Sequence, residues 1–312
     1  LRDSAGFAPD FPAGTRRAVL QACGESNRTI GSDGRMSEAL PAGITRTQDP
    51  GGREALRMQG RGGTVLVSVH GAQVLSWQRP DGDVLWTASS PEYAPHKPVR
   101  GGVPIVFPWF SDHPTDKKLP AHGFARTLVW RLVSTRPGPE IAFETTDDAA
   151  TRVMWPHSFR LGFRVALGPA LRLELRVDNT GSSAISFENA LHTYFSVGDV
   201  RTATVHGLEG VACTEHAAAP EASWDGKQPL HFRAETDRIF QGVPDRIELQ
   251  APALRRKVVL ATTNARSAIV WNPWPAKTAR LSQMVANDWQ RFVCIESANV
   301  REHRLTLAPG AS

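Results

Sequence analysis

Two ionisable side chains lie inside stretches of this sequence that otherwise have the apolar pattern of strands. His192 lies in the run from Phe187 to Val197, and Glu296 follows four apolar residues in the run from Arg291 to Val300. A buried carboxylate is costly unless it is paired or kept for chemistry, and a buried neutral histidine is often satisfied by a backbone carbonyl. Each residue is therefore either a structural polar group or half of an acid/base pair, and periodicity does not decide between these interpretations.

Two arginines lie close to glycines in segments with the composition of loops. Arg100 precedes Gly101 and Gly102, which tolerate positive φ or a close backbone approach, and Arg126 follows His122 by four residues. A single arginine is usually solvated. Two guanidinium groups together match the oxygens of a phosphate, so the pair indicates an anion site if both loops reach one pocket.

The remaining polar candidates are weaker. Asp237 is adjacent to Arg238, where a surface ion pair is the simplest interpretation, and spacing does not decide its role. The three cysteines, Cys23, Cys213 and Cys294, predict neither a disulfide framework nor a zinc site. Glycine-rich phosphate loops, zinc-protease motifs and serine-hydrolase motifs are absent, so we expect no metal and no cofactor.

Short strands are the elements that must position these residues. From about Thr64, β-branched and aromatic residues alternate with polar ones in runs bounded by Gly, Pro, Asp or Asn. We expect strands over residues 64–70, 127–133, 140–144, 171–177, 185–187, 246–249, 257–261, 268–271, 291–296 and 304–307. Because the helical spacers of a parallel βαβ sheet are missing, the pattern predicts an antiparallel all-β fold, with two large sheets packed face to face in a single domain.

Composition excludes some classes of protein and sets one segment apart. Of 312 residues, 41% are hydrophobic, and no stretch approaches the ~18 consecutive apolar residues of a membrane span. The formal net charge is +5, but basic residues are scattered among acidic ones, which argues against nucleic-acid binding. Residues 1–43 are rich in Gly, Pro, Ser and charge without a sustained period, so we expect a tail there and the domain over residues 44–312.

Taken together, these segments resemble the galactose-mutarotase-like superfamily, and within it the hexose-6-phosphate mutarotases, or glucose-6-phosphate 1-epimerases. The resemblance covers about Gly71 to Pro309, and it is specific because individually weak motifs occur in the family's order. They span residues 71–77 (GAQVLSW), 97–104 (KPVRGGVP), 122–126 (HGFAR), 155–159 (WPHSF), 191–195 (LHTYF), 236–240 (TDRIF), 270–274 (VWNPW) and 294–300 (CIESANV). The fold implied is an antiparallel β-supersandwich with the site on a concave face.

The resemblance also implies roles for the candidate residues. They are His192 and Glu296 as the catalytic pair, Arg100 and Arg126 as phosphate ligands with His122 in the same loop, and Asp237 as a ligand of a sugar hydroxyl. Ala121 departs from a Gln that contacts substrate in some relatives, which bears on substrate preference rather than chemistry. The implied isomerase opens the sugar ring and recloses it as the other anomer. A base takes the anomeric proton and an acid protonates the ring oxygen, and we assign Glu296 and His192 to these tasks.

Two other functions stay open. An aldose 1-epimerase for unphosphorylated sugars shares the fold and the acid/base pair but has no use for two phosphate-binding arginines. A non-catalytic carbohydrate-binding protein keeps aromatic surfaces without needing His192 and Glu296 together. We expect a cytoplasmic monomer that acts on a small sugar phosphate and binds neither nucleic acid nor membranes.

Deletion of residues 1–35, so that the chain starts at Met36, tests the predicted tail. Because these residues lack the apolar surface of a core, we expect the midpoint of thermal unfolding to change by less than about 2 °C. A fall of more than about 5 °C, measured by circular dichroism, would contradict the prediction.

Overall fold

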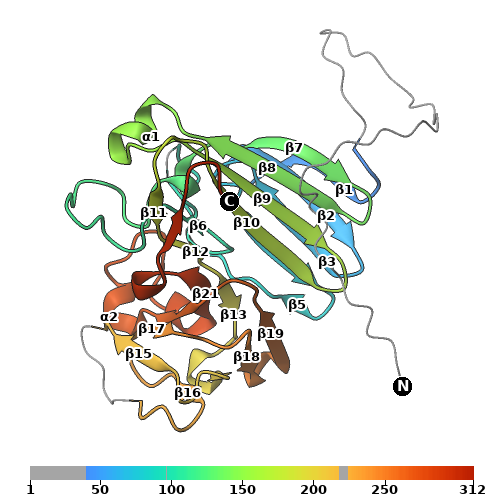
Figure 1. Cartoon of the computed structure of the whole chain (residues 1–312). Coiled ribbons are helices and arrows are strands. Elements are labelled where there is room, and N and C mark those ends of the chain that lie inside the picture. Colours follow the sequence, from blue (N-terminus) through green and yellow to red (C-terminus); the bar gives the residue numbers. More distant parts are fainter. Residues whose placement is uncertain (1–39, 96, 218–223) are drawn as a thin grey trace, which may run out of the picture. The chain divides into compact units, whose positions relative to one another are not determined.

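The computed structural model describes residues 40–95, 97–217 and 224–312, and the tail predicted over residues 1–43 lies almost entirely outside them. Strands dominate the described residues, which contain two short α-helices, α1 (Ala149–Met154) and α2 (Trp274–Thr278). All pairings between the named strands are antiparallel, and Figure 1 shows their arrangement. The predicted antiparallel all-β fold is confirmed.

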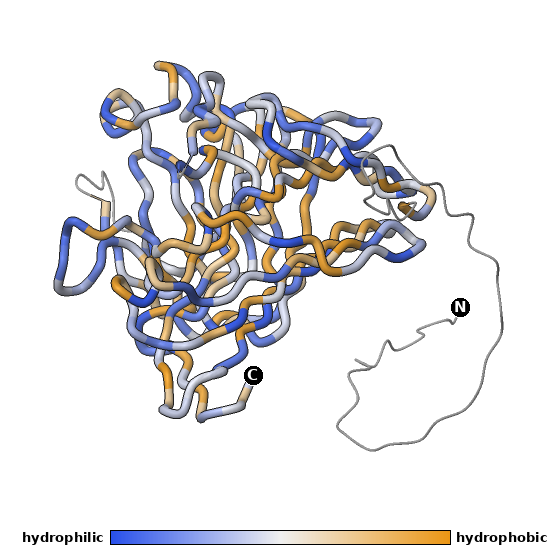
Figure 2. Tube along the Cα trace, turned by 90° about the horizontal axis from the view of Figure 1, so that it is seen from above, coloured by the Kyte–Doolittle hydropathy of each residue, from blue (hydrophilic) through white to orange (hydrophobic). Residues whose placement is uncertain are grey.

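Two sheets share one large apolar core. The first has the order β1-β2-β3-β4-β5, with strands Ile44–Gln48, Glu54–Gly60, Gly63–Ser68, Val74–Arg79 and Gly82–Asp83. The second has the order β10-β9-β8-β7, with strands Leu171–Asn179, Phe159–Leu167, Glu140–Thr146 and Arg131–Arg136. Alternate residues of β9 are buried and join the same core as Leu56 and Met58 of β2, which is the pattern of two sheets packed by their inner faces. Figure 2 shows the apolar stretches of these strands running mostly through the interior.

A third sheet has seven strands and is covered on both faces. Its order is β15-β17-β20-β21-β12-β6, with β13 also paired to β21. The strands are β6 (Ile105–Val106), β12 (Asn189–Leu191), β13 (Tyr194–Ser196), β15 (Ala212–Glu215), β17 (Thr236–Gln241), β20 (Ser267–Asn272) and β21 (Phe292–Asn299). Every residue of β20 is buried. Val270 and Ile295 face the large core, whereas Ile269 and Cys294 belong to a separate apolar cluster on the other face.

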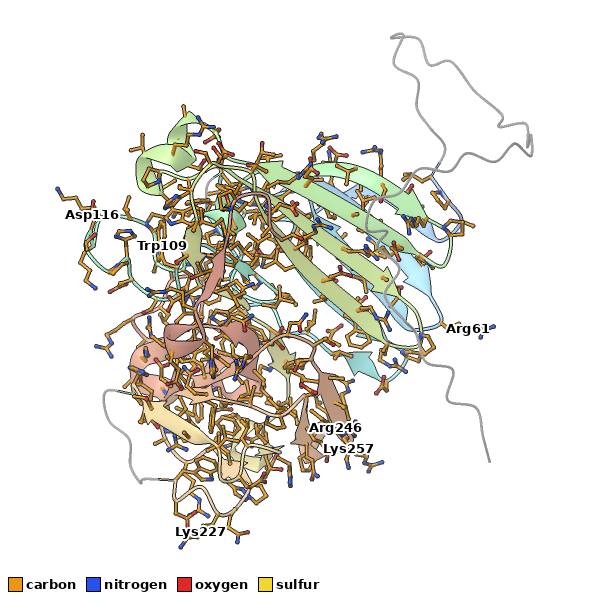
Figure 3. All side chains as sticks on the ribbon, viewed as in Figure 1. Arg61, Trp109, Asp116, Lys227, Arg246 and Lys257 are labelled. Atoms are coloured by element: carbon orange, nitrogen blue, oxygen red, sulfur yellow. The ribbon has the colours of Figure 1, made fainter. Side chains whose placement is uncertain are left out.

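Smaller elements complete the domain. β11 (Ile185–Phe187) pairs with β22 (Leu305–Leu307), and a four-stranded sheet has the order β16-β14-β18-β19. The latter strands are Leu230–His231, Thr204–His206, Arg246–Ala251 and Arg256–Ala261, and Figure 3 labels Arg246 on β18 and Lys257 on β19. The 3-10 helices are η1 (Ala125–Thr127), η2 (Val200–Thr202), η3 (Pro252–Leu254), η4 (Asp288–Arg291) and η5 (Arg301–His303).

The predicted strands agree with the observed ones except near residue 127. The strand predicted over 127–133 is wrong at its start, because η1 occupies its first residue and β7 begins only at Arg131. The Thr127 hydroxyl donates to the Phe124 carbonyl at 2.8 Å, and the Trp130 indole donates to the Ala125 carbonyl at 3.0 Å. These local bonds hold the segment as a turn and leave Arg126 on a loop that reaches the large sheet.

Candidate active site

His192 and Glu296 lie opposite each other at a break in the large sheet. β12 and β13 both pair with β21, and the two pairings keep one register, which places His192 opposite Glu296. The ladder is interrupted between these strands, because the His192 N–H donates to the Pro104 carbonyl at 3.0 Å and the Thr193 N–H donates to the Leu191 carbonyl at 2.9 Å. The sheet therefore aligns two side chains that are far apart in the sequence, while the backbone N–H groups of His192 and Thr193 bond outside the ladder with β21.

The two side chains form a buried pair with unused polar atoms. Nε2 of His192 lies 3.3 Å from Oε1 of Glu296, and the residues are only 7% and 1% exposed. The imidazole stacks on the ring of Tyr194, with centroids 4.8 Å apart and an interplanar angle of 9°. Nδ1 of His192 and Oε2 of Glu296 are buried and have no hydrogen-bond partner among the described residues. Each buried polar atom without a hydrogen bond lowers the stability of the fold by roughly 1–3 kcal/mol. The two atoms therefore indicate a polar ligand that supplies the missing hydrogen bonds.

Burial moves the two pKa values in opposite directions. Burial, and after it the positive charges of Arg126 and Arg100, lower the pKa of His192 to about 3. Burial and then the charge of Asp237 raise the pKa of Glu296 well above its ordinary value, against the opposing effect of Arg126. Both shifts favour the neutral form of each side chain, a carboxylic acid 3.3 Å from an imidazole, and at this distance a proton can pass between them.

His122 adds a neutral hydrogen-bond donor next to this pair. Its ring centroid lies 5.6 Å from that of His192. The Ser111 N–H donates to Nδ1 of His122 at 3.2 Å, which assigns the imidazole proton to Nε2. Burial, followed by neighbouring positive charges, lowers the pKa of His122 well below its ordinary value. The residue is held at a φ of 63°, in the left-handed region that few residues other than Gly adopt, as expected where a side chain must be aimed.

Both predicted arginines reach this site from separate loops. Arg126 lies on η1, its guanidinium donates to the Ala121 carbonyl at 2.7 Å, and burial lowers its pKa to about 10. Nε of Arg100 donates to the Ser282 carbonyl at 3.0 Å, and its backbone N–H donates to Oε1 of Gln283 at 3.0 Å. Both guanidinium charges act on the pKa of the buried imidazole. Both guanidinium groups therefore lie near enough to influence the buried pair electrostatically, and their role as phosphate ligands stays a prediction.

Glycines and prolines shape the loop that carries Arg100. Gly101 and Gly102 have φ values of 124° and 60°, as expected from the sequence. A Cβ atom at Gly102 would lie 2.0 Å from the Val74 carbonyl oxygen, so the loop lies directly against β4. Pro104 precedes β6, which forms the edge of the large sheet.

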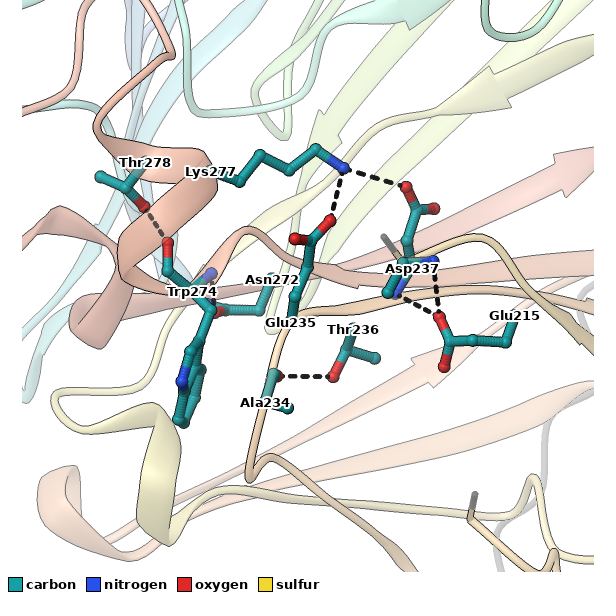
Figure 4. A network of polar contacts seen from close by, with 10 residues as sticks. Glu215, Ala234, Glu235, Thr236, Asp237, Asn272, Trp274, Lys277 and Thr278 are labelled. Atoms are coloured by element: carbon teal, nitrogen blue, oxygen red, sulfur yellow. Dashed lines mark hydrogen bonds and ion pairs between the residues drawn. The ribbon is translucent and has the colours of Figure 1, made fainter. Parts of the chain in front are cut away.

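Asp237 takes part in a polar network on β17, shown in Figure 4. Its Oδ2 lies 3.4 Å from Nζ of Lys277, which also pairs with Glu235 at 2.9 Å. Arg238 instead pairs with Glu215 at 2.5 Å, so a local ion pair between Asp237 and Arg238 is wrong, because successive strand residues point to opposite faces. Burial raises the pKa of Asp237, and the charge of Lys277 opposes that shift.

The sequence analysis missed two residues that support the site, Lys277 and Gln283. Oε1 of Gln283 accepts from the N–H groups of Glu92 and Arg100 at 3.1 and 3.0 Å, and its Nε2 donates to the Pro98 carbonyl at 3.1 Å. Lys277 follows the WNPW motif closely, a signal that could have drawn attention to it. Gln283 lies in no strand-like run and bonds residues far away in sequence, so no local pattern marks it.

The described residues were also compared with what a metal site, a membrane-spanning helix and a reactive thiol require. They contain no group of three or more His, Cys, Asp or Glu side chains placed to hold a metal ion. None of their helices has the length and apolar character needed to cross a membrane. Cys213 and Cys294 are free thiols, and burial raises the pKa of Cys294 well above its ordinary value.

Comparisons with known proteins find relatives over most of the chain. Residues 54–312 match the family model described as aldose 1-epimerase. A candidate glucose-6-phosphate 1-epimerase from Cenchrus ciliaris is 31% identical over 275 residues, which cover 84% of this chain and 82% of that protein. A protein of the same description from Escherichia coli strain K12 is 32% identical over 241 residues, covering 75% and 79%. The crystal structure of a candidate mutarotase from Salmonella typhimurium has a TM-score of 0.78 at 27% identity and covers 88% of this chain and 91% of that one.

The low pKa of His192 predicts that this residue makes the fold less stable in acid, an effect opposite in sign to that of the raised pKa of Glu296. In the unfolded chain the imidazole of His192 binds a proton below about pH 6.5, whereas in the folded chain it does so only near pH 3. The contribution of His192 to the free energy of unfolding is therefore lost as the pH falls from about 6.5 toward 3. We expect His192→Asn to reduce the loss of unfolding free energy between pH 7 and pH 4 by roughly 2–3 kcal/mol in urea titrations. The exposed His231, changed to Asn, is the matched control and should follow the wild type. Equal pH dependence in His192→Asn and the wild type would contradict the prediction.

Proposed function

We propose that this chain, which belongs to the aldose 1-epimerase family, interconverts the α and β anomers of glucose 6-phosphate or a closely related hexose 6-phosphate. The observation that carries the proposal is the buried pair of His192 and Glu296, 3.3 Å apart, under the influence of two guanidinium groups. The description of the Cenchrus and Escherichia relatives as candidate glucose-6-phosphate 1-epimerases supports the same substrate. A monomeric, cytoplasmic enzyme that needs no cofactor stays our prediction.

The proposed reaction uses the pair as base and acid in one step. Glu296, as a carboxylate, takes the proton from the anomeric hydroxyl while the bond between C1 and the ring oxygen breaks. His192 gives a proton to that ring oxygen, so the product is the open-chain aldehyde and the net charge of the site is unchanged. Rotation about the C1–C2 bond presents the other carbonyl face, and the reverse proton transfers close the ring as the other anomer. On the return step, Glu296 therefore donates a proton and His192 accepts one.

The phosphate group would help to prepare this acid/base state. The positive charges of Arg100 and Arg126 both lower the pKa of His192. A phosphate dianion between the two guanidinium groups offsets their charge, so the pKa of the imidazole rises and a protonated imidazole becomes accessible. The proton can come from Glu296, whose pKa is raised by burial and whose Oε1 lies 3.3 Å from Nε2 of His192. Substrate binding thereby favours the carboxylate and imidazolium that ring opening requires.

The remaining site residues would orient the sugar. Nε2–H of His122 is a neutral donor beside His192, and Asp237 is an acceptor held by Lys277. An epimerase of unphosphorylated sugars would have no use for guanidinium groups brought to the site by two separate loops. A binding protein would have no use for two buried, unpartnered acid/base atoms.

Substitutions of the pair test the mechanism. Glu296→Gln keeps the shape but removes the base, so we expect the anomer exchange rate to fall by about 10²–10⁴, and His192→Asn to cost a similar factor. Because the two residues act as a unit, the double variant should lose far less than the product of the single losses. Rates are measured by exchange NMR above the spontaneous background at low buffer phosphate. Glu302→Gln, at an exposed position, is the matched control, and a wild-type rate in Glu296→Gln would refute the mechanism.

Substitution of Arg126 tests the substrate. Arg126→Ala should raise KM for glucose 6-phosphate about tenfold or more, because a charge-assisted contact is lost. Slow turnover of unphosphorylated glucose should stay nearly unchanged, since that sugar carries no group for the guanidinium to bind. Arg131→Ala, at an exposed position on β7, should alter neither value. An equal loss on both sugars would instead indicate a structural role for Arg126.

A further inference from the structure

A second cavity lies on the opposite face of the large sheet from the acid/base pair. Its volume is about 480 Å³, within the range of roughly 300–1,000 Å³ that is typical of small-molecule sites. Leu191 and Thr193, the two neighbours of His192, line it together with Ser297, the neighbour of Glu296. Because successive strand residues point to opposite faces, this cavity is separated from the candidate active site by one thickness of sheet.

The cavity is open because three sheet edges meet around it. β5, β10 and β19 are each the last strand of their sheets. Residues of β10 and β19 line the cavity, as do Asp81 and Val84 on either side of β5, in the region in which Figure 1 shows β5, β13 and β19 close together. Inner-face side chains at these edges are only partly covered by the large core. They are Trp77, Leu171, Leu173, Leu191, Val258 and Leu260. Partly exposed apolar side chains that converge on one hollow indicate a surface suited to an apolar body.

Four cationic residues line the same cavity. They are Arg79, Arg255, Arg256 and Lys257, against the single carboxylate of Asp81. Asp81 already lies 3.8 Å from Arg79 and 3.4 Å from Arg256, and Lys257 pairs with Glu248 at 2.9 Å.

Arg255 is the cation of this cavity that has no partner. Within residues 40–95, 97–217 and 224–312, its side chain makes no hydrogen bond or ion pair. It is exposed, and its φ of 51° lies in the left-handed region. The cavity thus joins an apolar wall to an unpaired guanidinium group.

We propose that this cavity is a second ligand site, which binds a small anion with an apolar body, such as an aromatic or short-chain phosphate, sulfonate or carboxylate. The apolar wall would cover the body, and Arg255 would bind the charged end. The occupant touches the strand residues adjacent to His192 and Glu296, so it alters turnover without entering the active site.

The binding test uses 1-anilinonaphthalene-8-sulfonate, a fluorescent anion with an apolar body, titrated into the full chain. We expect saturable binding that Arg255→Ala weakens about tenfold and that Val258→Trp, which fills the cavity, abolishes. Arg246→Ala is the matched control, because this exposed arginine lies on the neighbouring β18 and does not line the cavity (Figure 3). Circular dichroism verifies that each variant is folded. Since Arg255 is exposed and its loss should not impair folding, unchanged binding in Arg255→Ala overturns the proposal.

A second measurement separates this site from the active site. Saturating glucose 6-phosphate should leave the dye bound, and the dye should change kcat for anomer exchange while leaving KM nearly unchanged. Displacement of the dye by glucose 6-phosphate, or purely competitive inhibition, would place the dye in the active site and overturn the proposal. The binding titration needs no turnover. It therefore tests the second site even if the proposed mutarotase activity is absent.

Discussion

The shared register of β12 and β13 along β21 is the constraint on which the candidate site depends. It places His192 opposite Glu296, and a slip of one residue in either pairing would turn one of the two side chains to the opposite face. The hydrogen bond from His192 to Pro104 opens the ladder at this one point, while the paired strands on both sides keep the alignment. The structure thus combines a local break in the ladder with a defined distance between acid and base.

Burial is the main cause of the shifted pKa values of His192 and Glu296. The sheet has the large core behind it and a second apolar cluster on the site face, so burial is the largest cause of both pKa shifts. Arg100, Arg126 and Asp237 add charges that act on the pair from three different segments. Because these charges partly oppose one another, a ligand that neutralises the two guanidinium groups can change the protonation state of the pair without moving the backbone.

The edges of the sheets explain why a second cavity can exist beside a well-packed core. The two sheets that share the large core end at β5 and β10, and β19 of a third sheet only partly closes the gap between them. Side chains that would be fully buried further inside, such as Leu173, are therefore only partly buried at this edge. β21 carries the cavity residue Ser297 on one face and Glu296 of the acid/base pair on the other, so an occupant of the cavity would lie one thickness of sheet from the pair.

The sequence by itself determined the antiparallel strand class and the identities of the candidate residues, because alternation of apolar side chains and the order of short motifs are local properties of the chain. It misplaced the strand start near Arg126, where side-chain hydrogen bonds favour a turn. Only the tertiary structure decided the 3.3 Å contact between His192 and Glu296, the partner of Asp237, and the part that Gln283 plays in holding the Arg100 loop. These features depend on pairing between distant segments and on burial from water, and neither quantity is encoded by the residues next to any one of them.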